Sequence, residues 1–315
     1  MSTLALVTGG AGFIGSHIVR ALLRRGWRVR VLDNFSTGKA ENLAGLEPTR
    51  LEVIEGDLRD PAAVQQAVRG AAVVFHQAAF VSVPASMDDP LTCHAVNDAG
   101  TARLLEAARW AGVGKVVLAS SAAVYGDADD FPLSEDLPPR PLSPYAATKA
   151  ATELYARLYT VAYGLPVVAL RYFNVYGPRQ RPDSPYAAAV PIFVRRMLHG
   201  EPPIVFGDGG QRRDLIFVED VAAANLRAAE SDAAAGEVLN VCTGQEVSLL
   251  ELIAHLRTLI PHAPPPRFAP PRPGDIYRSV GAPAKAARVL GFRAQTPLQE
   301  GLAAVVAWMA RQEGQ

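Results

Sequence analysis

The sequence predicts an α/β fold with a doubly wound parallel sheet and a smaller, mostly C-terminal second domain. Short apolar runs alternate with longer amphipathic stretches, and the runs at 73–75, 116–120 and 167–171 are typical of strands buried on both faces. A length of 315 residues fits about two domains and supports a sizeable core without disulfides or metal ions. After residue 173 this rhythm loosens, and proline and glycine clusters begin.

The expected elements follow one another as strand and helix. A helix is predicted over 12–25, and strands over 4–8, 28–33, 51–56, 73–75, 116–120 and 167–171. Asp60 and Asp89 each stand before a proline, which marks a capping carboxylate ahead of the first helical residue. A helix over 219–231 and a strand over 238–242 are expected to return to the sheet. The predicted first domain therefore comprises 1–173 and about 219–245, and the second 174–218 and 246–315.

Three segments rich in proline and glycine interrupt the second half, at 177–185, 201–210 and 261–274. Such segments are either plain surface loops or parts of a lid that faces a ligand. Periodicity alone leaves both interpretations open.

Composition excludes several classes of protein. The 31 lysines and arginines balance 31 aspartates and glutamates, so no overall field favours nucleic acid or an anionic membrane. Cys93 and Cys242 stand apart from each other and from any histidine cluster, which indicates buried small side chains rather than a disulfide or a metal site. The sequence lacks a long apolar span and a signal-like start, so we expect a cytoplasmic protein.

A glycine-rich loop, TGGAGFIGSH, lies between the first predicted strand and the first helix. Gly9, Gly12 and Gly15 recur there at three-residue spacing. Glycines at these places permit a tight turn, bring backbone N–H groups against a pyrophosphate and let helix pack on strand, as in a Rossmann dinucleotide-binding fold. Asp33 ends the second strand, where a carboxylate accepts both adenosine ribose hydroxyls and repels a 2′-phosphate. The expected cofactor is therefore NAD rather than NADP.

Tyr145 and Lys149 form a candidate catalytic pair in SPYAATK. Ser143 as N-cap and Pro144 as first helical residue put them on one helix face. The tyrosine pKa of about 10 must fall to ~7 for base catalysis, which takes about 4 kcal/mol of preferential phenolate stabilisation. The neighbouring ammonium, a cationic nicotinamide ring and the positive helix terminus can supply it. Ser121, in SSAAVYG at the C-terminal end of a strand, can hold a substrate oxygen near the tyrosine.

These motifs resemble those of the extended short-chain dehydrogenase/reductases. TGGAGFIGSH, LDNFSTGK, GDL, HQAA, SSAAVYG, YAATK and RYFNVYGPRQ occur in that family's order and spacing, and the similarity to its UDP-glucose 4-epimerase group runs essentially end to end. The resemblance implies catalysis by Ser121, Tyr145 and Lys149. It implies an NAD site that comprises Gly9, Gly12, Phe13, Ile14, Gly15, Asp33, Asn34, Ser36, Thr37, Gly38, Asp57, Leu58, Gln77, Ala78, Ala79, Asn97, Ser120, Tyr145, Lys149 and Tyr172.

Two features of this comparison remain open to a second interpretation. Asp57 either bonds the adenine amino group or only stabilises a turn. The family's homodimer pairs the helix that carries Tyr145 and Lys149 with the helix before it, and the alanines at 146, 147, 150 and 151 suit either that interface or an internal core.

The position of Ala123 bears on the reaction. Dehydratases and decarboxylases of this superfamily carry a glutamate there, two residues after the catalytic serine or threonine, as an extra acid or base. Ser121, Tyr145 and Lys149 alone suffice for transfer and return of a hydride. The predicted reaction is therefore inversion at C4 of a UDP-sugar, in which Tyr145 takes the 4-OH proton, hydride leaves C4 for NAD, the 4-keto sugar turns over, and hydride returns to the opposite face.

The resemblance assigns the uridine diphosphate and the sugar to residues of the second domain. The implied contacts are Asn174, Arg181, Ala189, Val190, Phe206, Arg213, Arg272, Asp275 and Ser279. Arginines suit bidentate phosphate recognition, although most surface arginines are only solvated charges. The small Ser279 leaves room for an N-acetyl group, so UDP-glucose and UDP-N-acetylglucosamine are both expected substrates. Arg181 matches a carboxylate-reading position of UDP-glucuronate 4-epimerases, which carry threonine in place of Asn174, and UDP-glucuronate is therefore the alternative.

Two further functions stay open at this stage. One is a non-catalytic NAD-binding regulator, against which the intact Ser121, Tyr145 and Lys149 set argues. The other is a net oxidoreductase that releases NADH. No metal site, nucleic-acid partner or membrane partner is expected.

Overall fold

The computed structural model describes residues 3–182, 188–271 and 276–313 of the chain. Its largest sheet in these ranges has seven parallel strands in the order β11-β6-β5-β4-β1-β2-β3. These strands are β1 (Leu4–Thr8), β2 (Arg28–Asp33), β3 (Leu51–Glu55), β4 (Val73–His76), β5 (Lys115–Ser121), β6 (Val167–Tyr172) and β11 (Val238–Val241). The predicted doubly wound parallel sheet is confirmed, and each predicted strand is present with its ends moved by at most one residue.

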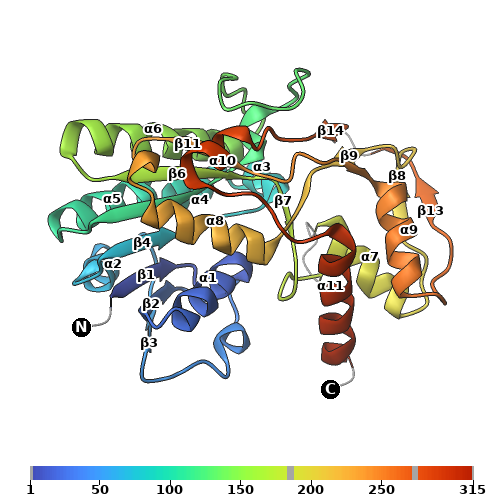
Figure 1. Cartoon of the computed structure of the whole chain (residues 1–315), viewed down its shortest axis with the longest axis horizontal. Helices are drawn as coiled ribbons and strands as arrows, with labels where there is room; N and C mark the ends of the chain where they lie inside the picture. The colour runs from blue at the N-terminus through green and yellow to red at the C-terminus, as the bar shows by residue number, and fades with distance from the viewer. Residues whose placement is uncertain (1–2, 183–187, 272–275, 314–315) are drawn as a thin grey trace.

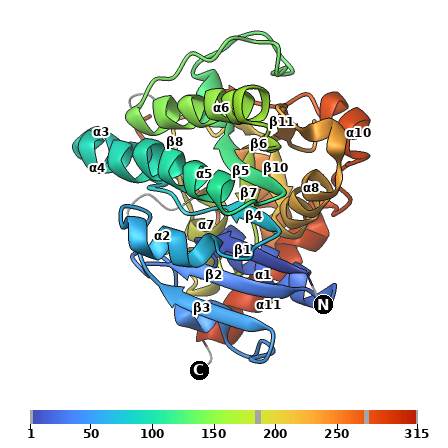
Figure 2. The ribbon, with the colours of Figure 1, turned by 90° about the vertical axis from the view of Figure 1, so that its left-hand side faces the viewer.

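Helices cover both faces of this sheet, as Figure 2 shows. One face carries α1 (Phe13–Arg24) and α8 (Val218–Glu230), and the other carries α2 (Pro61–Val68), α5 (Gly100–Trp110) and α6 (Pro144–Tyr163). Each face has its own apolar core, and every residue of β6 is buried between the two. Burial on both faces is the reason why the central strands β4, β5 and β6 read as largely apolar runs.

Side-chain caps fix where the helices begin. Asp60 accepts a 2.9 Å bond from Ala62 N at the start of α2, and Asp89 accepts a 3.0 Å bond from Thr92 N at the start of α4 (Pro90–His94). Ser143 Oγ accepts a 3.1 Å bond from the third residue of α6. Such a cap stabilises a helix by about 1 kcal/mol. The starts that the Asp-Pro and Ser-Pro pairs predict are therefore confirmed.

A smaller group of elements lies beside the sheet, on the right of Figure 1. The helices α7 (Ala189–Leu198), α9 (Leu249–Leu259) and α11 (Leu298–Glu313) share a separate apolar core there. Short strands complete it, namely β7 (Asn174–Tyr176) with β10 (Leu215–Phe217), β8 (Ile204–Phe206) with β13 (Arg267–Ala269), and β9 (Arg212–Arg213) between β12 (Val247–Ser248) and β14 (Arg278–Ser279). Two segments expected as loops thus contain β8 and β13, because each strand is too short to show a periodicity.

The remaining elements are short. They are α3 (Val83–Asp88), α10 (Ala284–Leu290), the 3₁₀ turns Ala40–Leu43, Ala122–Tyr125 and Asp232–Ala234, and one π-helical turn (Ala95–Ala99) that joins α4 to α5. Cys93 and Cys242 are buried free thiols, as predicted. In the described ranges, no helix has the length and apolar character needed to cross a membrane.

Candidate active site

The glycine-rich loop follows β1, where the strand order of the sheet reverses. The strands β2 and β3 extend the sheet on one side of β1, and β4 lies on its other side. Gly9 adopts a φ of 67°, and a Cβ there would come within 2.6 Å of Ala78 N at the end of β4. A Cβ on Gly15 would come within 2.1 Å of Gly9 O. Glycine is thus required at both positions, once for the turn and once for close packing of helix on strand.

The N-terminus of α1 has no cap from a side chain. Gly12 is the N-cap, it provides no hydrogen-bonding group beyond its backbone, and no acidic residue stands in the first turn. The N–H groups of Phe13 and Ile14 at this positive helix end therefore remain available to an anion. This arrangement fits the pyrophosphate of a dinucleotide cofactor.

Asp33 ends β2 beside this loop and is 7% exposed. Its Oδ2 accepts a 2.9 Å bond from Ala11 N, and its Oδ1 accepts a 2.9 Å bond from Phe35 N. Burial raises the pKa of this carboxyl, and the two backbone bonds oppose the rise. The carboxylate therefore joins the glycine loop to the segment that holds Asn34, Ser36, Thr37 and Gly38, and each oxygen keeps lone-pair capacity for a ribose hydroxyl.

Asp57 is occupied by its own turn. Arg59 donates to both carboxylate oxygens at 2.9 Å, and Asn34 Nδ2 donates to Oδ2 at 2.8 Å. These bonds, that of Arg59 foremost, hold the pKa of the carboxyl well below its usual range. The contacts correspond to the turn-stabilising interpretation, and the adenine contact stays a prediction. The side chain of the following Leu58 lies in the core at 4% exposure.

Gln77 and Tyr172 are hydrogen-bonded to Asn225, a residue that the sequence reasoning missed. The Tyr172 hydroxyl lies 3.2 Å from Gln77 Oε1 and 2.8 Å from Asn225 Nδ2, and Gln77 Nε2 donates to Asn225 Oδ1 at 3.2 Å. Asn225 is fully buried on α8. A polar residue on the apolar face of the predicted helix was the signal that could have found it.

Asn97 braces the segment after β4 against the helix that carries Tyr145. Its Oδ1 accepts a 2.7 Å bond from Phe80 N, and its Nδ2 donates to Phe80 O at 3.0 Å and to Thr148 Oγ1 at 3.1 Å. It is 2% exposed and lies in the π-helical turn. Its side chain therefore supports the cleft, and a direct cofactor contact stays a prediction.

The structure brings Ser121, Tyr145 and Lys149 together. Ser121 ends β5, its Oγ accepts a 3.1 Å bond from Ala123 N, and its hydroxyl lies close enough to the Tyr145 phenol to lower the pKa of that phenol. Lys149 Nζ donates to Ala119 O at 2.7 Å and lies 5.9 Å from the centroid of the Tyr145 ring. All three groups thus occupy the carboxyl end of β5 and the first turns of α6, where ligands bind in such sheets.

Burial shifts the pKa values of the two titratable groups, Tyr145 and Lys149, in opposite directions. It raises the pKa of the Tyr145 phenol, and the nearby Ser121 hydroxyl opposes this rise. Burial lowers the pKa of Lys149 to about 8. Both groups are thus pushed towards their neutral forms. The protein groups alone do not lower the pKa of the phenol. The predicted Tyr145 pKa of ~7 therefore depends on the positive charge of a bound nicotinamide ring.

A cavity of about 640 Å³ has Asn174 in its wall, two residues after the strand partner of Ser121. Ser121 is paired with Tyr172, and β7 begins two residues later at Asn174. The cavity wall includes five of the predicted substrate positions, which are Asn174, Ala189, Val190, Phe206 and Arg213. Ser279 lies opposite Arg213 in the β9–β14 pair, so it stands at the same place. Five predicted positions therefore line one cavity and a sixth lies beside one of them, although they come from distant parts of the sequence.

The other predicted substrate positions differ. Arg181 Nη1 lies 3.4 Å from the carbonyl oxygen of Thr37, beside the segment expected at the adenosine. Its described contact is thus on the cofactor side of the cleft. Arg272 and Asp275 lie outside the described residues.

Ser120 turns its hydroxyl away from the cleft and towards α6. It donates a 2.6 Å bond to Glu153 Oε1, and Glu153 holds Arg171 through two 2.8 Å bonds. Glu153 and Arg171 are buried, with side chains 5% and 3% exposed. The sequence reasoning missed this pair, although an arginine inside a buried strand and a glutamate four residues after Lys149 were signals for it.

Comparison with known proteins identifies the family of the chain. The profile of the NAD dependent epimerase/dehydratase family matches residues 5–242. The chain is 44% identical to the UDP-glucose 4-epimerase of Mycolicibacterium smegmatis, over 96% of each protein.

Two solved structures match almost the whole fold. A UDP-glucose 4-epimerase of Thermus thermophilus in complex with NAD has a TM-score of 0.89 and 44% identity, over 98% of this chain and 99% of that one. A UDP-N-acetylglucosamine 4-epimerase of Methanobrevibacter ruminantium, in complex with UDP-N-acetylmuramic acid, has a TM-score of 0.95 and 39% identity, over 99% of both. The resemblance drawn from the motifs is confirmed, and the chain belongs to the NAD dependent epimerase/dehydratase family, with NAD as its cofactor.

Proposed function

We propose that this enzyme inverts the configuration at C4 of a UDP-sugar. The observation that carries the proposal is the group of Ser121, Tyr145 and Lys149, with Ala123 two residues beyond the serine. An elimination or a decarboxylation calls for a further acid or base at that place, and alanine offers none. The likeness to two 4-epimerases over nearly the full length supports the same reaction.

Each catalytic side chain then has one task. Ser121 donates a hydrogen bond to the sugar 4-oxygen and holds it against the phenol. The Tyr145 phenolate takes the 4-OH proton and later gives it back. Lys149 places a positive charge near that phenolate and so favours it. NAD, when bound at Gly12, Phe13 and Asp33, supplies the chemistry of accepting a hydride from C4 and returning it to the opposite face.

The nucleotide must stay fixed while the sugar turns over. The 640 Å³ cavity suits this task, since it offers the Phe206 ring, the Arg213 guanidinium and the Asn174 amide in one place. An arginine binds a diphosphate through paired N–H groups. Ser279, opposite Arg213, adds little bulk, which supports room for an N-acetyl group. We therefore propose that both the hexose and the N-acetylhexosamine forms are substrates.

UDP-glucuronate is the second candidate, and it depends on Arg181. In this structure the guanidinium of Arg181 is bonded to the carbonyl oxygen of Thr37, on the cofactor side. That contact favours the uncharged sugars as the first assignment.

Product analysis tests the proposal. The purified enzyme is incubated separately with UDP-glucose, UDP-N-acetylglucosamine and UDP-glucuronate, and the products are resolved by NMR. We expect the C4 epimers of the first two, with no NADH released. Stoichiometric release of NADH would show a net oxidoreductase, and turnover of UDP-glucuronate alone would overturn the assignment to uncharged sugars.

We also propose that the enzyme is a homodimer formed through α5 and α6. Leu154, Leu158 and Val161 lie on one face of α6 and are 72%, 46% and 77% exposed, and Trp110 at the end of α5 is 75% exposed. A group of large apolar side chains that are exposed on neighbouring helices is typical of an interface. Light scattering should give twice the chain mass, and Leu158→Glu should give one chain mass. Phe268→Glu, an exposed apolar residue on β13, is the control and should leave the mass unchanged.

A further inference from the structure

Asp214 is a fully buried carboxylate between β9 and β10. Its Oδ1 accepts bonds from Thr243 N at 2.8 Å and Thr243 Oγ1 at 2.6 Å. Its Oδ2 accepts bonds from Gly244 N at 2.9 Å and Gly281 N at 3.3 Å. Among the described residues no lysine, arginine or histidine pairs with it, so neutral donors alone hold the charge.

The backbone of the same residue reaches the substrate cavity. Its carbonyl oxygen accepts 3.1 Å bonds from both Asn174 N and Asn174 Nδ2. Its N–H donates to Ser279 O at 2.8 Å, and its neighbour in the chain is Arg213. Asp214 therefore touches, or adjoins, three of the positions that converge on the cavity.

We propose that Asp214 is the positioning residue of the nucleotide-diphosphate subsite, an inference that rests on the proposed function. Its carboxylate locks the segments at 243–244 and 281 to the β9–β10 junction. Its backbone then fixes Asn174 and Ser279 relative to Arg213. Asp214 makes no contact with the ligand itself, and its charge sets the geometry of groups that do.

The donor count explains why this position holds a carboxylate. Four donors converge on two oxygens, and an ionised carboxylate accepts all of them without offering a donor of its own. An asparagine of the same shape would direct an NH₂ group at two of these donors. The loop segments would then move apart, because a buried donor without an acceptor is costly.

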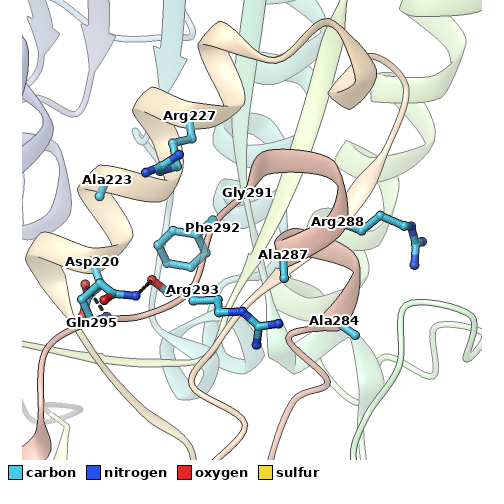
Figure 3. Close-up of a pocket in the computed structure, with 10 residues that line it drawn as sticks. All are labelled: Asp220, Ala223, Arg227, Ala284, Ala287, Arg288, Gly291, Phe292, Arg293 and Gln295. Atoms are coloured by element: carbon cyan, nitrogen blue, oxygen red, sulfur yellow. Dashed lines mark hydrogen bonds between the residues drawn. The ribbon is translucent and has the colours of Figure 1, made fainter.

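Asp220 on α8 provides a matched control. It is 6% exposed, and its two oxygens accept bonds from Gln295 N at 3.1 Å and Thr296 N at 3.0 Å. Figure 3 shows it near Gln295 in a second cavity, and none of the residues that line this cavity is a predicted substrate position. Asp220→Asn therefore removes a buried, backbone-bonded carboxylate without changing the nucleotide cavity.

The test measures binding of UDP to the NAD-loaded enzyme by titration calorimetry, below the unfolding temperature of every variant. Asp214→Asn should weaken UDP binding by about tenfold, as expected for lost hydrogen bonds to a charged group. The KM for the UDP-sugar should rise by a similar factor, while kcat and the NAD content stay near wild type. Asp220→Asn should lower Tm and leave UDP affinity unchanged.

Thr243→Val keeps the inference testable if Asp214→Asn does not fold. It removes one donor, and UDP binding should weaken by about threefold. Equal losses in Asp214→Asn and Asp220→Asn, or unchanged UDP affinity in Asp214→Asn or Thr243→Val, would overturn the inference alone. Failure of the wild-type enzyme to bind UDP would instead overturn the proposed nucleotide site and the inference with it.

Discussion

Lys149 Nζ donates a 2.7 Å hydrogen bond to the carbonyl oxygen of Ala119, two residues before Ser121 on the same strand. This bond ties helix α6 to the carboxyl end of β5. The serine hydroxyl and the tyrosine phenol therefore keep a fixed separation. The same bond holds the ammonium 5.9 Å from the Tyr145 ring centroid, where its charge acts on the phenol.

Tyr145→Phe should abolish proton transfer and leave the fold intact. The ring keeps its packing and only the hydroxyl is lost, so turnover should fall by about 10²- to 10⁴-fold. NAD content, measured after denaturation, should match the wild type. Tyr163→Phe removes a hydroxyl from the end of the same helix and should keep full activity. A fully active Tyr145→Phe enzyme would refute the assigned base.

Lys149→Met should change the pH dependence as well as the rate. Loss of the ammonium removes a positive charge close to the phenol, so the pKa of Tyr145 rises. The fraction of phenolate then falls at every pH below that value. Turnover at neutral pH should drop by about 10²-fold, and the rising limb of the pH–rate profile should move to higher pH. A lower rate with an unmoved profile would show that the lysine acts only through packing.

Glu153→Gln should cost stability rather than a catalytic group. The change leaves the Arg171 charge unpaired behind β5, where its side chain is 3% exposed. Removing one partner of a buried pair lowers the free energy of unfolding by about 3 kcal/mol or more. Glu52→Gln breaks the partly exposed 2.8 Å pair with Arg30 and should cost less than about 1 kcal/mol. Urea unfolding of both variants measures the difference, and equal losses would contradict it.

Local sequence signals predicted the sheet, and they placed the groups expected on the cofactor side of the site near one another. The residues of each group there are close in sequence. Gly9, Gly12 and Gly15 share one turn, and Tyr145 and Lys149 share one helix face. Spacing alone therefore places such groups together. The same holds for helices that begin at Asp-Pro or Ser-Pro pairs, because a cap acts within one turn.

Local sequence signals could not predict how the residues of the substrate side come together. Asp214 gains its role from Asn174, Thr243 and Gly281, and only the folded chain brings these together. The strands β9, β12 and β14 have two residues each, too few to show an alternating pattern. The resemblance named the residues of this cavity, but the carboxylate beneath them had no local signature.

His17 should make the enzyme sensitive to acid. It lies on α1 at 4% exposure, its Nε2 lies 3.0 Å from Pro178 O, and Arg179, Arg20 and Arg24 are near. Burial foremost lowers the pKa of this imidazole to about 4 from an ordinary 6.5. Between these two values the unfolded chain binds a proton that the folded chain does not. Stability contributed by the neutral form is therefore complete above pH 6.5 and is lost as the pH falls towards 4.

The loss at pH 5 should be about 2 kcal/mol for this one histidine. His76, whose pKa burial lowers to about 3, adds a similar slope that remains in a His17 variant. His17→Gln keeps a donor for Pro178 O but cannot be protonated in this range. Urea unfolding at pH 7 and pH 5 should therefore show a stability difference about 2 kcal/mol smaller in His17→Gln than in the wild type. An identical difference in both proteins would mean that His17 takes up its proton equally well in the folded chain, and that the contact between α1 and the segment at 178–179 does not exclude the charge.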